Sequence, residues 1–191
     1  MEYKYIILGV FVSIVIFISF TVASIKSEQI ASDPIISFFN IEAKSIFGET
    51  IKMDKYRGKK ILIVNVASKC GLTPQYSELQ ELYKTYSDSL VVLAFPSNDF
   101  LRQEPGSNEQ IAKFCSTEYF TTFPLFEKVK VKGKNKHSIY DWLTDPEKNG
   151  WNSKGPTWNF TKYLIDENGK LLKRFSPKTL PLSKDIISLI K

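Results

Sequence analysis

The sequence has few of the residues that build metal centres and disulfide scaffolds. Among its 191 residues there are two cysteines, Cys70 and Cys115, and one histidine, His137. Two cysteines exclude a disulfide-dense small scaffold and a four-cysteine zinc site, and a single histidine excludes a histidine-rich metal centre. We therefore expect no bound metal and no resident cofactor, and the two thiols become the first candidates for chemistry.

The charge is also not concentrated in one block. Lys and Arg number 26 against 20 Asp and Glu, a net charge of +6. The densest basic stretch, residues 127–136, alternates with valine and glycine. This pattern is typical of a solvated loop, whereas a nucleic-acid surface needs a basic face with stacking aromatic side chains. We expect no nucleic-acid partner.

One long run lacks charge altogether. Residues 5–25 are 21 residues without a charged side chain, and a helix of that length spans the roughly 30 Å hydrocarbon layer of a bilayer. A secretory signal usually has an apolar region of only about 7–15 residues. Residues 1–26 are therefore predicted to be a membrane anchor, forming an N-terminal hydrophobic helix, or else a signal segment. The anchored domain would lie outside the cytoplasm, and cleavage would make it secreted or periplasmic.

A polar, turn-rich linker over residues 27–34 leads into one folded unit over residues 35–191. Short runs of β-branched residues alternate there with segments whose apolar residues recur at helical spacing. Ser107 with Gln110 forms a capping-box pattern. These features favour an α/β domain. The pattern predicts extended segments or strands over residues 35–41, 49–53, 60–66, 90–95, 126–131, 163–165 and 171–175, and helices over 75–86, 107–115, 137–143 and 182–190.

Cys70 comes just after a predicted buried strand and before a predicted helix. A helix N-terminus and the adjacent Lys69 both favour a thiolate at such a position, although a buried, inert cysteine is the simpler alternative. Thr73 stands where a Cys-x-x-Cys oxidoreductase has its second thiol. Dithiol exchange at one helix end is therefore excluded.

Uncharged hydrogen-bond donors occur in two later segments. Asn98 and Gln103 follow the next predicted strand, and Trp158 with Asn159 precedes a strand much later in the chain. Amide and indole N–H groups stabilise a thiolate without competing as nucleophiles. Their convergence on Cys70 would make a catalytic site.

Four stretches that contain these residues, in the same order, resemble the glutathione peroxidase family in its cysteine-containing, non-selenium form. The resemblance covers residues 35–191 and implies a thioredoxin-like fold, with a central mixed sheet flanked by helices, an additional N-terminal hairpin and an inserted helix. The matching stretches are residues 65–73, 95–100, 103–109 and 158–166.

The resemblance also implies roles. Cys70 would be the peroxidatic cysteine, with Gln103, Trp158 and Asn159 completing a tetrad, and the substrate would be hydrogen peroxide or an organic or lipid hydroperoxide. Cys115 matches the resolving cysteine of thioredoxin-dependent members, so thioredoxin or glutathione would be the reductant. The alternatives are that Cys115 only packs its helix, or that the two cysteines form a permanent disulfide.

The sequence departs from the family pattern at three places. Asp99 and Leu101 replace the usual glutamine and glycine, which affects the loop beside the site, and Ser97 stands where many members have a further cysteine. The loop before His137 is short, which favours a monomer or weak dimer. A membrane-tethered redox sensor or thiol–disulfide exchange protein, using a Cys70–Cys115 disulfide, is the rival to a peroxidase.

Overall fold

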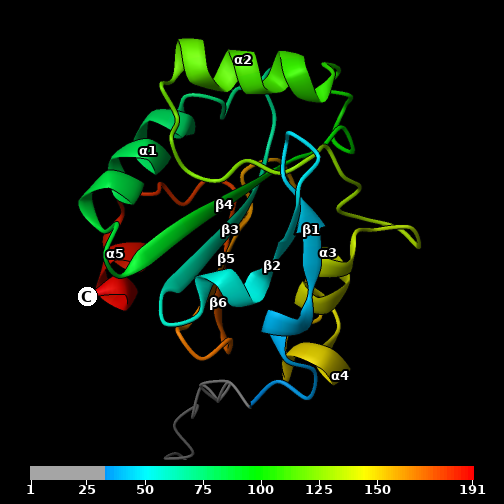
Figure 1. The fold of residues 1–191 in the computed structure, drawn as a ribbon, viewed down its shortest axis with the longest axis vertical. Helices are drawn as coiled ribbons and strands as arrows, with labels where there is room; N and C mark the ends of the chain where they lie inside the picture. Colours follow the sequence, from blue (N-terminus) through cyan, green and yellow to red (C-terminus); the bar gives the residue numbers. More distant parts are fainter. Residues whose placement is uncertain (1–32) are drawn as a thin grey trace, which may run out of the picture. The chain divides into compact units, whose positions relative to one another are not determined.

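The fold is built on a four-stranded mixed sheet in the order β4–β3–β5–β6 (Figure 1). The strands are β3 (Lys60–Val66), β4 (Leu90–Pro96), β5 (Lys162–Ile165) and β6 (Leu171–Phe175). β3 and β4 are parallel, and the other two pairs are antiparallel, so the expected mixed sheet is confirmed.

The computed structural model describes residues 33–191. The predicted anchor or signal segment, with its hydrophobic helix, lies outside the described residues, as does most of the linker. Within residues 33–191, none of the helices combines the length and the apolar character that a bilayer crossing requires.

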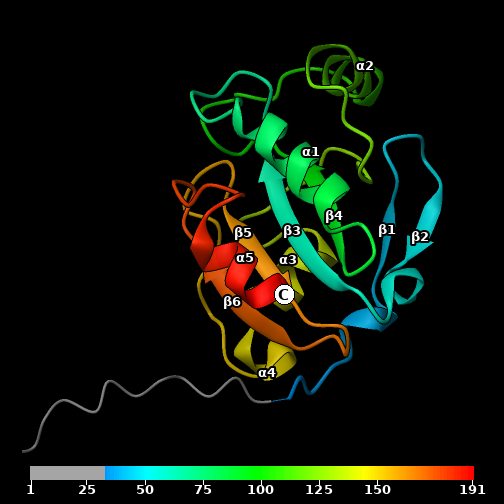
Figure 2. The same cartoon turned by 90° about the vertical axis from the view of Figure 1, so that its left-hand side faces the viewer.

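Alternating side chains of β3 face two separate apolar layers, as a strand's period of two requires. Ile61 and Ile63 face the layer that contains α3 (Ser138–Leu143), whereas Leu62 and Val64 face the other layer. That second layer contains α1 (Gln75–Thr85), α2 (Asn108–Glu118) and α5 (Lys184–Ile190). Figure 2 shows α1 and α5 in front of the sheet.

The parallel pairing of β3 and β4 brings the carboxyl ends of both strands to the same edge of the sheet. Their register runs through to Val66 opposite Pro96, and Ser97 N continues the ladder by donating to Val66 O at 3.0 Å. The segments that follow the two strands, residues 67–74 and 97–107, therefore start side by side. This edge holds Cys70 and Gln103.

Most of the predicted elements are confirmed. The Ser107–Gln110 capping box begins α2, and the turn at residues 166–169 joins β5 to β6. α2 continues past Cys115 to Glu118, one turn beyond the prediction. The N-terminal hairpin is formed by β1 (Glu42–Lys44) and β2 (Thr50–Lys52). Two further short elements are η2 (Met53–Tyr56) and α4 (Pro146–Asn149).

Two predicted extended segments were wrong. Residues 35–41 contain a 3₁₀ turn, η1 (Phe38–Asn40), because Phe38 is buried against the Trp142 ring with centroids 5.2 Å apart. Residues 126–131 form no strand; only isolated bridges tie Leu125 and Phe126 to neighbouring segments. In both cases tertiary packing, rather than local β propensity, decided the conformation.

A buried lysine joins three segments near the site edge. Lys162, on β5, is 0 % exposed, and its Nζ donates to Gln75 Oε1 at 2.6 Å, Phe160 O at 2.8 Å and Thr179 O at 2.8 Å. Burial lowers the pKa of Lys162 to about 7, and nearby Glu78 opposes that shift. Three close oxygen acceptors match the three N–H groups of an ammonium. The network ties the start of α1 and the loop after β6 to the sheet.

The Lys162→Met variant removes the donor from these three acceptors, of which Gln75 Oε1 and Phe160 O are in buried hydrogen bonds. We expect its free energy of unfolding to be about 3 kcal/mol lower than that of the wild type, as measured by urea denaturation. Lys173→Met, which removes an exposed lysine from β6, should change the free energy by less than about 0.5 kcal/mol. Equal stability of the two variants would contradict the network's contribution.

Candidate active site

Cys70 lies in a tight turn between β3 and α1. Its side chain is 8 % exposed. Leu72 N donates to Cys70 Sγ at 3.4 Å, and Cys70 N donates to Thr73 Oγ1 at 3.0 Å. Leu72 N is the backbone donor to the sulfur within residues 33–191. It belongs to this turn and not to α1, which begins only at Gln75. The position between strand and helix is confirmed, but the turn itself supplies the donor.

Gln103 and Asn159 meet beside that turn. Asn159 is fully buried, and its Nδ2 donates to Gln103 Oε1 at 2.9 Å. Gln103 O in turn accepts from Lys69 N at 3.0 Å, which ties the Gln103 loop to the residue preceding Cys70. Gln103 Oε1 is occupied by Asn159, and the Gln103 Nε2 protons have no acceptor within the described part of the chain. They are available to a bound oxygen or sulfur.

Trp158 is held at the same edge by a residue that sequence reasoning missed. Asn65, buried near the end of β3, donates from Nδ2 to Trp158 O at 3.1 Å, and Asn65 O accepts from Phe160 N at 2.6 Å. The half-buried Trp158 ring packs on Phe100 with centroids 5.5 Å apart. The available signal was a single amide within the apolar run of residues 61–66.

Two of the three departures from the family pattern, Asp99 and Leu101, have structural consequences. Asp99 Oδ2 accepts from Val131 N at 2.7 Å and Lys132 N at 3.2 Å, so Asp99 tethers the loop after β4 to residues 131–132. Leu101 and Arg102 have φ angles of 49° and 52°, and Leu101 is 77 % exposed. Two successive non-glycine residues in the left-handed region store strain directly before Gln103.

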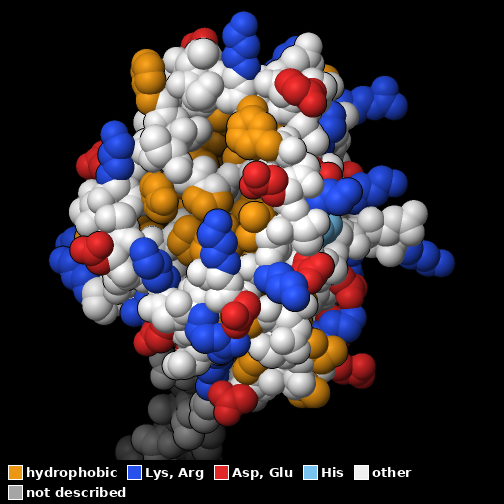
Figure 3. Space-filling view, viewed as in Figure 1, with side chains coloured by type: hydrophobic (Ala, Val, Ile, Leu, Met, Phe, Trp, Pro, Cys, Tyr) orange, Lys and Arg blue, Asp and Glu red, His pale blue; other side chains and the backbone are white. Residues whose placement is uncertain are grey.

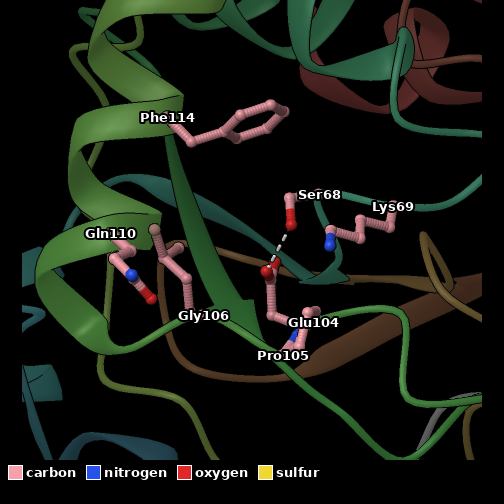
Figure 4. A pocket seen from close by; sticks show the side chains of 8 residues that line it. Ser68, Lys69, Glu104, Pro105, Gly106, Gln110 and Phe114 are labelled. Carbon is pink, nitrogen blue, oxygen red and sulfur yellow. Dashed lines mark hydrogen bonds between the residues drawn. The ribbon is translucent and has the colours of Figure 1, made fainter.

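Glu104 is a second buried group that sequence reasoning missed. Ser68 Oγ donates to Glu104 Oε1 at 2.6 Å, while Oε2 is buried and has no hydrogen-bond partner among residues 33–191. Burial raises the pKa of Glu104, and the Ser68 hydrogen bond opposes that shift. Figure 4 shows the carboxylate directed toward Ser68 in a pocket of about 360 Å³ between the Ser68–Lys69 segment and α2. The Ser68–Glu104 hydrogen bond is a second link between the Cys70 turn and the Gln103 loop.

Cys115 lies on the buried face of α2 and is 1 % exposed. Burial raises its pKa to about 11; Tyr76 opposes the shift and Glu104 adds to it. Cys70 and Cys115 belong to the same apolar cluster, and both are free thiols. No disulfide joins them in this structure.

An apolar groove of about 340 Å³ runs between the β1–β2 hairpin and α2. Phe47 lines it and is 81 % exposed, and Ala112 and Ser116 bring α2 to its wall. Figure 3 shows apolar side chains gathered on this face of the molecule. None of the four predicted catalytic residues lines the groove, so we assign it no part in the site.

Comparison with known proteins supports one family. The GSHPx family, glutathione peroxidase, matches residues 38–144. Glutathione peroxidase-like peroxiredoxin 2 of Saccharomyces cerevisiae is 51% identical over 150 residues, covering 78% of this chain and 93% of the yeast protein. Thioredoxin/glutathione peroxidase BtuE of Escherichia coli is 41% identical over 175 residues, covering 81% and 96% of the two chains. The crystal structure of Trgpx in apo form has a TM-score of 0.61 at 35% identity, covering 81% of this chain and 95% of that one.

A mixed sheet flanked by helices, with a cysteine in the turn after β3, is typical of thioredoxin-like thiol oxidoreductases. The comparison with solved structures confirms the thioredoxin-like fold. The chain belongs to the glutathione peroxidase family and is a non-selenium member. It is a thiol-dependent peroxidase, which takes a peroxide as substrate and a thiol as reductant. The rival redox sensor or exchange protein is not favoured.

The different burial of the two thiols predicts different reactivity. Only the thiolate reacts with iodoacetamide, and a pKa of about 11 leaves Cys115 with a thiolate fraction on the order of 10⁻⁴ at neutral pH. We expect reduced, folded protein at pH 7.5 to be labelled at Cys70 well before Cys115, as followed by peptide mass spectrometry. Labelling in 6 M guanidinium is the control, in which the two rates should converge. Faster labelling of Cys115 in the folded protein would contradict the assignment.

Proposed function

We propose that Cys70 is the peroxidatic cysteine and that Gln103, Trp158 and Asn159 assist it. The Cys70 thiolate attacks the outer oxygen of a hydroperoxide, the O–O bond breaks, and the sulfur becomes a sulfenic acid, oxidised by two electrons. The leaving alkoxide or hydroxide takes a proton and departs as alcohol or water. The substrates are hydrogen peroxide and organic or lipid hydroperoxides.

The observation that carries this proposal is the Asn159–Gln103 hydrogen bond beside the Cys70 turn. It orients the Gln103 amide so that the oxygen is occupied and the N–H groups remain free. A fixed N–H donor stabilises negative charge on the attacking sulfur and on the leaving oxygen, with little reorganisation during the reaction. The indole N–H of Trp158 is a third uncharged donor at the same edge of the sheet.

Cys115 is proposed as the resolving cysteine. Its thiol attacks the Cys70 sulfenic acid, a disulfide forms and one water leaves. Thioredoxin, or two molecules of glutathione, then returns both sulfurs to thiols by exchange. Because Cys115 is 1 % exposed on α2, opening of that helix is part of the proposed cycle. The names of the yeast and E. coli relatives, a peroxiredoxin and a thioredoxin/glutathione peroxidase, support this cycle.

Two serine variants test the unequal roles of the cysteines. We expect Cys70→Ser to lose peroxide consumption with every reductant, because the attacking sulfur is gone. Cys115→Ser should still be oxidised by peroxide for one turnover but should lose at least about 90% of its thioredoxin-driven rate. Full thioredoxin-driven turnover in Cys115→Ser would overturn the resolving role, and turnover in Cys70→Ser would overturn the whole assignment.

We further propose that residues 5–25 anchor the protein in a membrane, with the domain outside the cytoplasm as a monomer or weak dimer. The support is the sequence alone: 21 residues without a charge match the hydrocarbon thickness of a bilayer. A protein so tethered would meet hydroperoxides near the lipid surface.

An arginine at the centre of this segment costs about 3 kcal/mol of insertion free energy. We therefore expect full-length Ile16→Arg to move from the carbonate-resistant membrane fraction toward the soluble fraction. Ile16→Leu, which keeps the segment apolar, is the matched control and should stay with the membrane. A wild-type chain that is fully soluble, or that is shortened to a form lacking residues 1–26, would contradict the anchor.

A further inference from the structure

The buried thiol of Cys115 has to lose a proton before it can attack another sulfur. The thiolate, and not the thiol, is the nucleophile in disulfide formation. Burial raises the pKa of Cys115 to about 11, so only about one thiol in ten thousand is ionised at neutral pH. A group inside the protein that takes this proton would therefore speed the step.

Glu104 has an unused oxygen that can accept a proton. Its side chain is 0 % exposed, Ser68 Oγ donates to Oε1 at 2.6 Å, and Oε2 has no hydrogen-bond partner among residues 33–191. The Glu104 backbone is fixed on both sides, because its N–H donates to Asn98 Oδ1 at 2.9 Å and its carbonyl accepts from Lys128 Nζ at 3.3 Å. A buried polar atom without a partner is costly and calls for an explanation. The carboxylate is thus held in place with one acceptor site free.

The pocket that holds the Glu104 carboxylate borders both cysteine-bearing segments. α2 forms one wall, to which Ile111 and Phe114 contribute, and the opposite wall directly precedes Cys70 in the chain. Figure 4 shows the Phe114 side chain projecting from α2 into the pocket. Cys115 follows Phe114 and lies one helical turn after Ile111, on the same buried face of α2. Movement of this part of α2 therefore brings the Cys115 thiol toward the carboxylate.

The electrostatics of the region agree with this placement. Glu104 raises the pKa of Cys115 and that of the fully buried Tyr76 on α1, so its charge acts on both groups. Burial raises the pKa of Glu104 itself, and the Ser68 hydrogen bond opposes that shift. A carboxylate with a raised pKa is a stronger base. The other titratable or charged groups that act on Glu104, or on which it acts, are Lys69 in the Cys70 turn, Tyr76 on α1, Cys115 on α2 and Lys128.

We propose that Glu104 is the proton acceptor of the resolving step, an inference that rests on the proposed roles of Cys70 and Cys115. When α2 opens, the Cys115 thiol gives its proton to Glu104 Oε2, and the thiolate attacks the Cys70 sulfenic acid. The S–S bond forms, the S–O bond breaks, and the leaving hydroxide takes the proton from Glu104 and departs as water. The Cys115 sulfur is oxidised and the Cys70 sulfur is reduced, both to the level of a disulfide, so no further reactant is needed.

The test isolates the resolving step from the peroxide step. Glu104→Gln keeps the size of the side chain and an oxygen for Ser68 Oγ, but the amide cannot take the proton. Glu81→Gln is the matched control, because it removes the same charge from the exposed face of α1. The reduced, full-length protein is mixed with a small excess of hydrogen peroxide and quenched at intervals. Mass spectrometry then gives the rate constant for conversion of the trapped sulfenic acid into the Cys70–Cys115 disulfide.

We expect Glu104→Gln to slow this conversion at least about tenfold at neutral pH, and Glu81→Gln to change it less than about twofold. In the wild type, the rate constant should level off above the pKa of Glu104 and far below the pKa of about 11 of Cys115. In Glu104→Gln it should instead keep rising about tenfold per pH unit, because the solvent must then ionise the thiol.

The opposite sign of the effect would overturn the proposal. Faster conversion in Glu104→Gln would mean that the carboxylate only suppresses the Cys115 thiolate by its charge. An unchanged rate constant, or equal slowing in the two variants, would also overturn it. A wild-type rate constant that rises about tenfold per pH unit up to the pKa of Cys115 would do so without any variant. A wild-type protein in which peroxide forms no Cys70–Cys115 disulfide would overturn the proposed resolving role itself, and this inference with it.

Discussion

The buried amide of Asn65 holds the two halves of the site together. Asn65 is a polar side chain in a strand that is buried and apolar after its first residue, Lys60. It bonds the backbone of the Trp158–Phe160 segment through both its side chain and its carbonyl. A buried amide that lost these partners would carry a large desolvation penalty. The segment that contains Asn159 is thereby fixed at the end of the strand that leads to Cys70.

The remaining links at this edge join the Cys70 turn to the Gln103 loop. Lys69 N binds Gln103 O, and Ser68 Oγ binds the buried Glu104 carboxylate. The donor bonded to the Cys70 sulfur among residues 33–191, Leu72 N, is uncharged. Such a donor suits a thiol peroxidase, because it stabilises developing charge and cannot itself attack the peroxide. The strained backbone at Leu101–Arg102 is one cost of placing Gln103 at this edge of the sheet.

The local sequence pattern predicted an element correctly where apolar residues recurred at the period of that element, or where a cap or turn had characteristic residues. The strands before Cys70 and after α1, the capping box at Ser107 and the turn at residues 166–169 all follow from such signals. Pattern failed at Phe38, whose partner Trp142 is about a hundred residues away in the chain, and at residues 126–131, where isolated bridges replace a strand. Those conformations depend on distant contacts, which a local window does not contain.

The sequence by itself determined the α/β class, the four family-like stretches and the identity of the candidate residues Cys70, Gln103, Trp158, Asn159 and Cys115, because residue types and their order are enough to recognise them. Only the tertiary structure decided which of their atoms meet. The Asn159–Gln103 bond, the Ser68–Glu104 bond and the hydrogen bonds of Lys162 all join segments far apart in the chain. Hydrogen-bond direction and burial are properties of that three-dimensional juxtaposition, and the order of residues along the chain does not specify them locally.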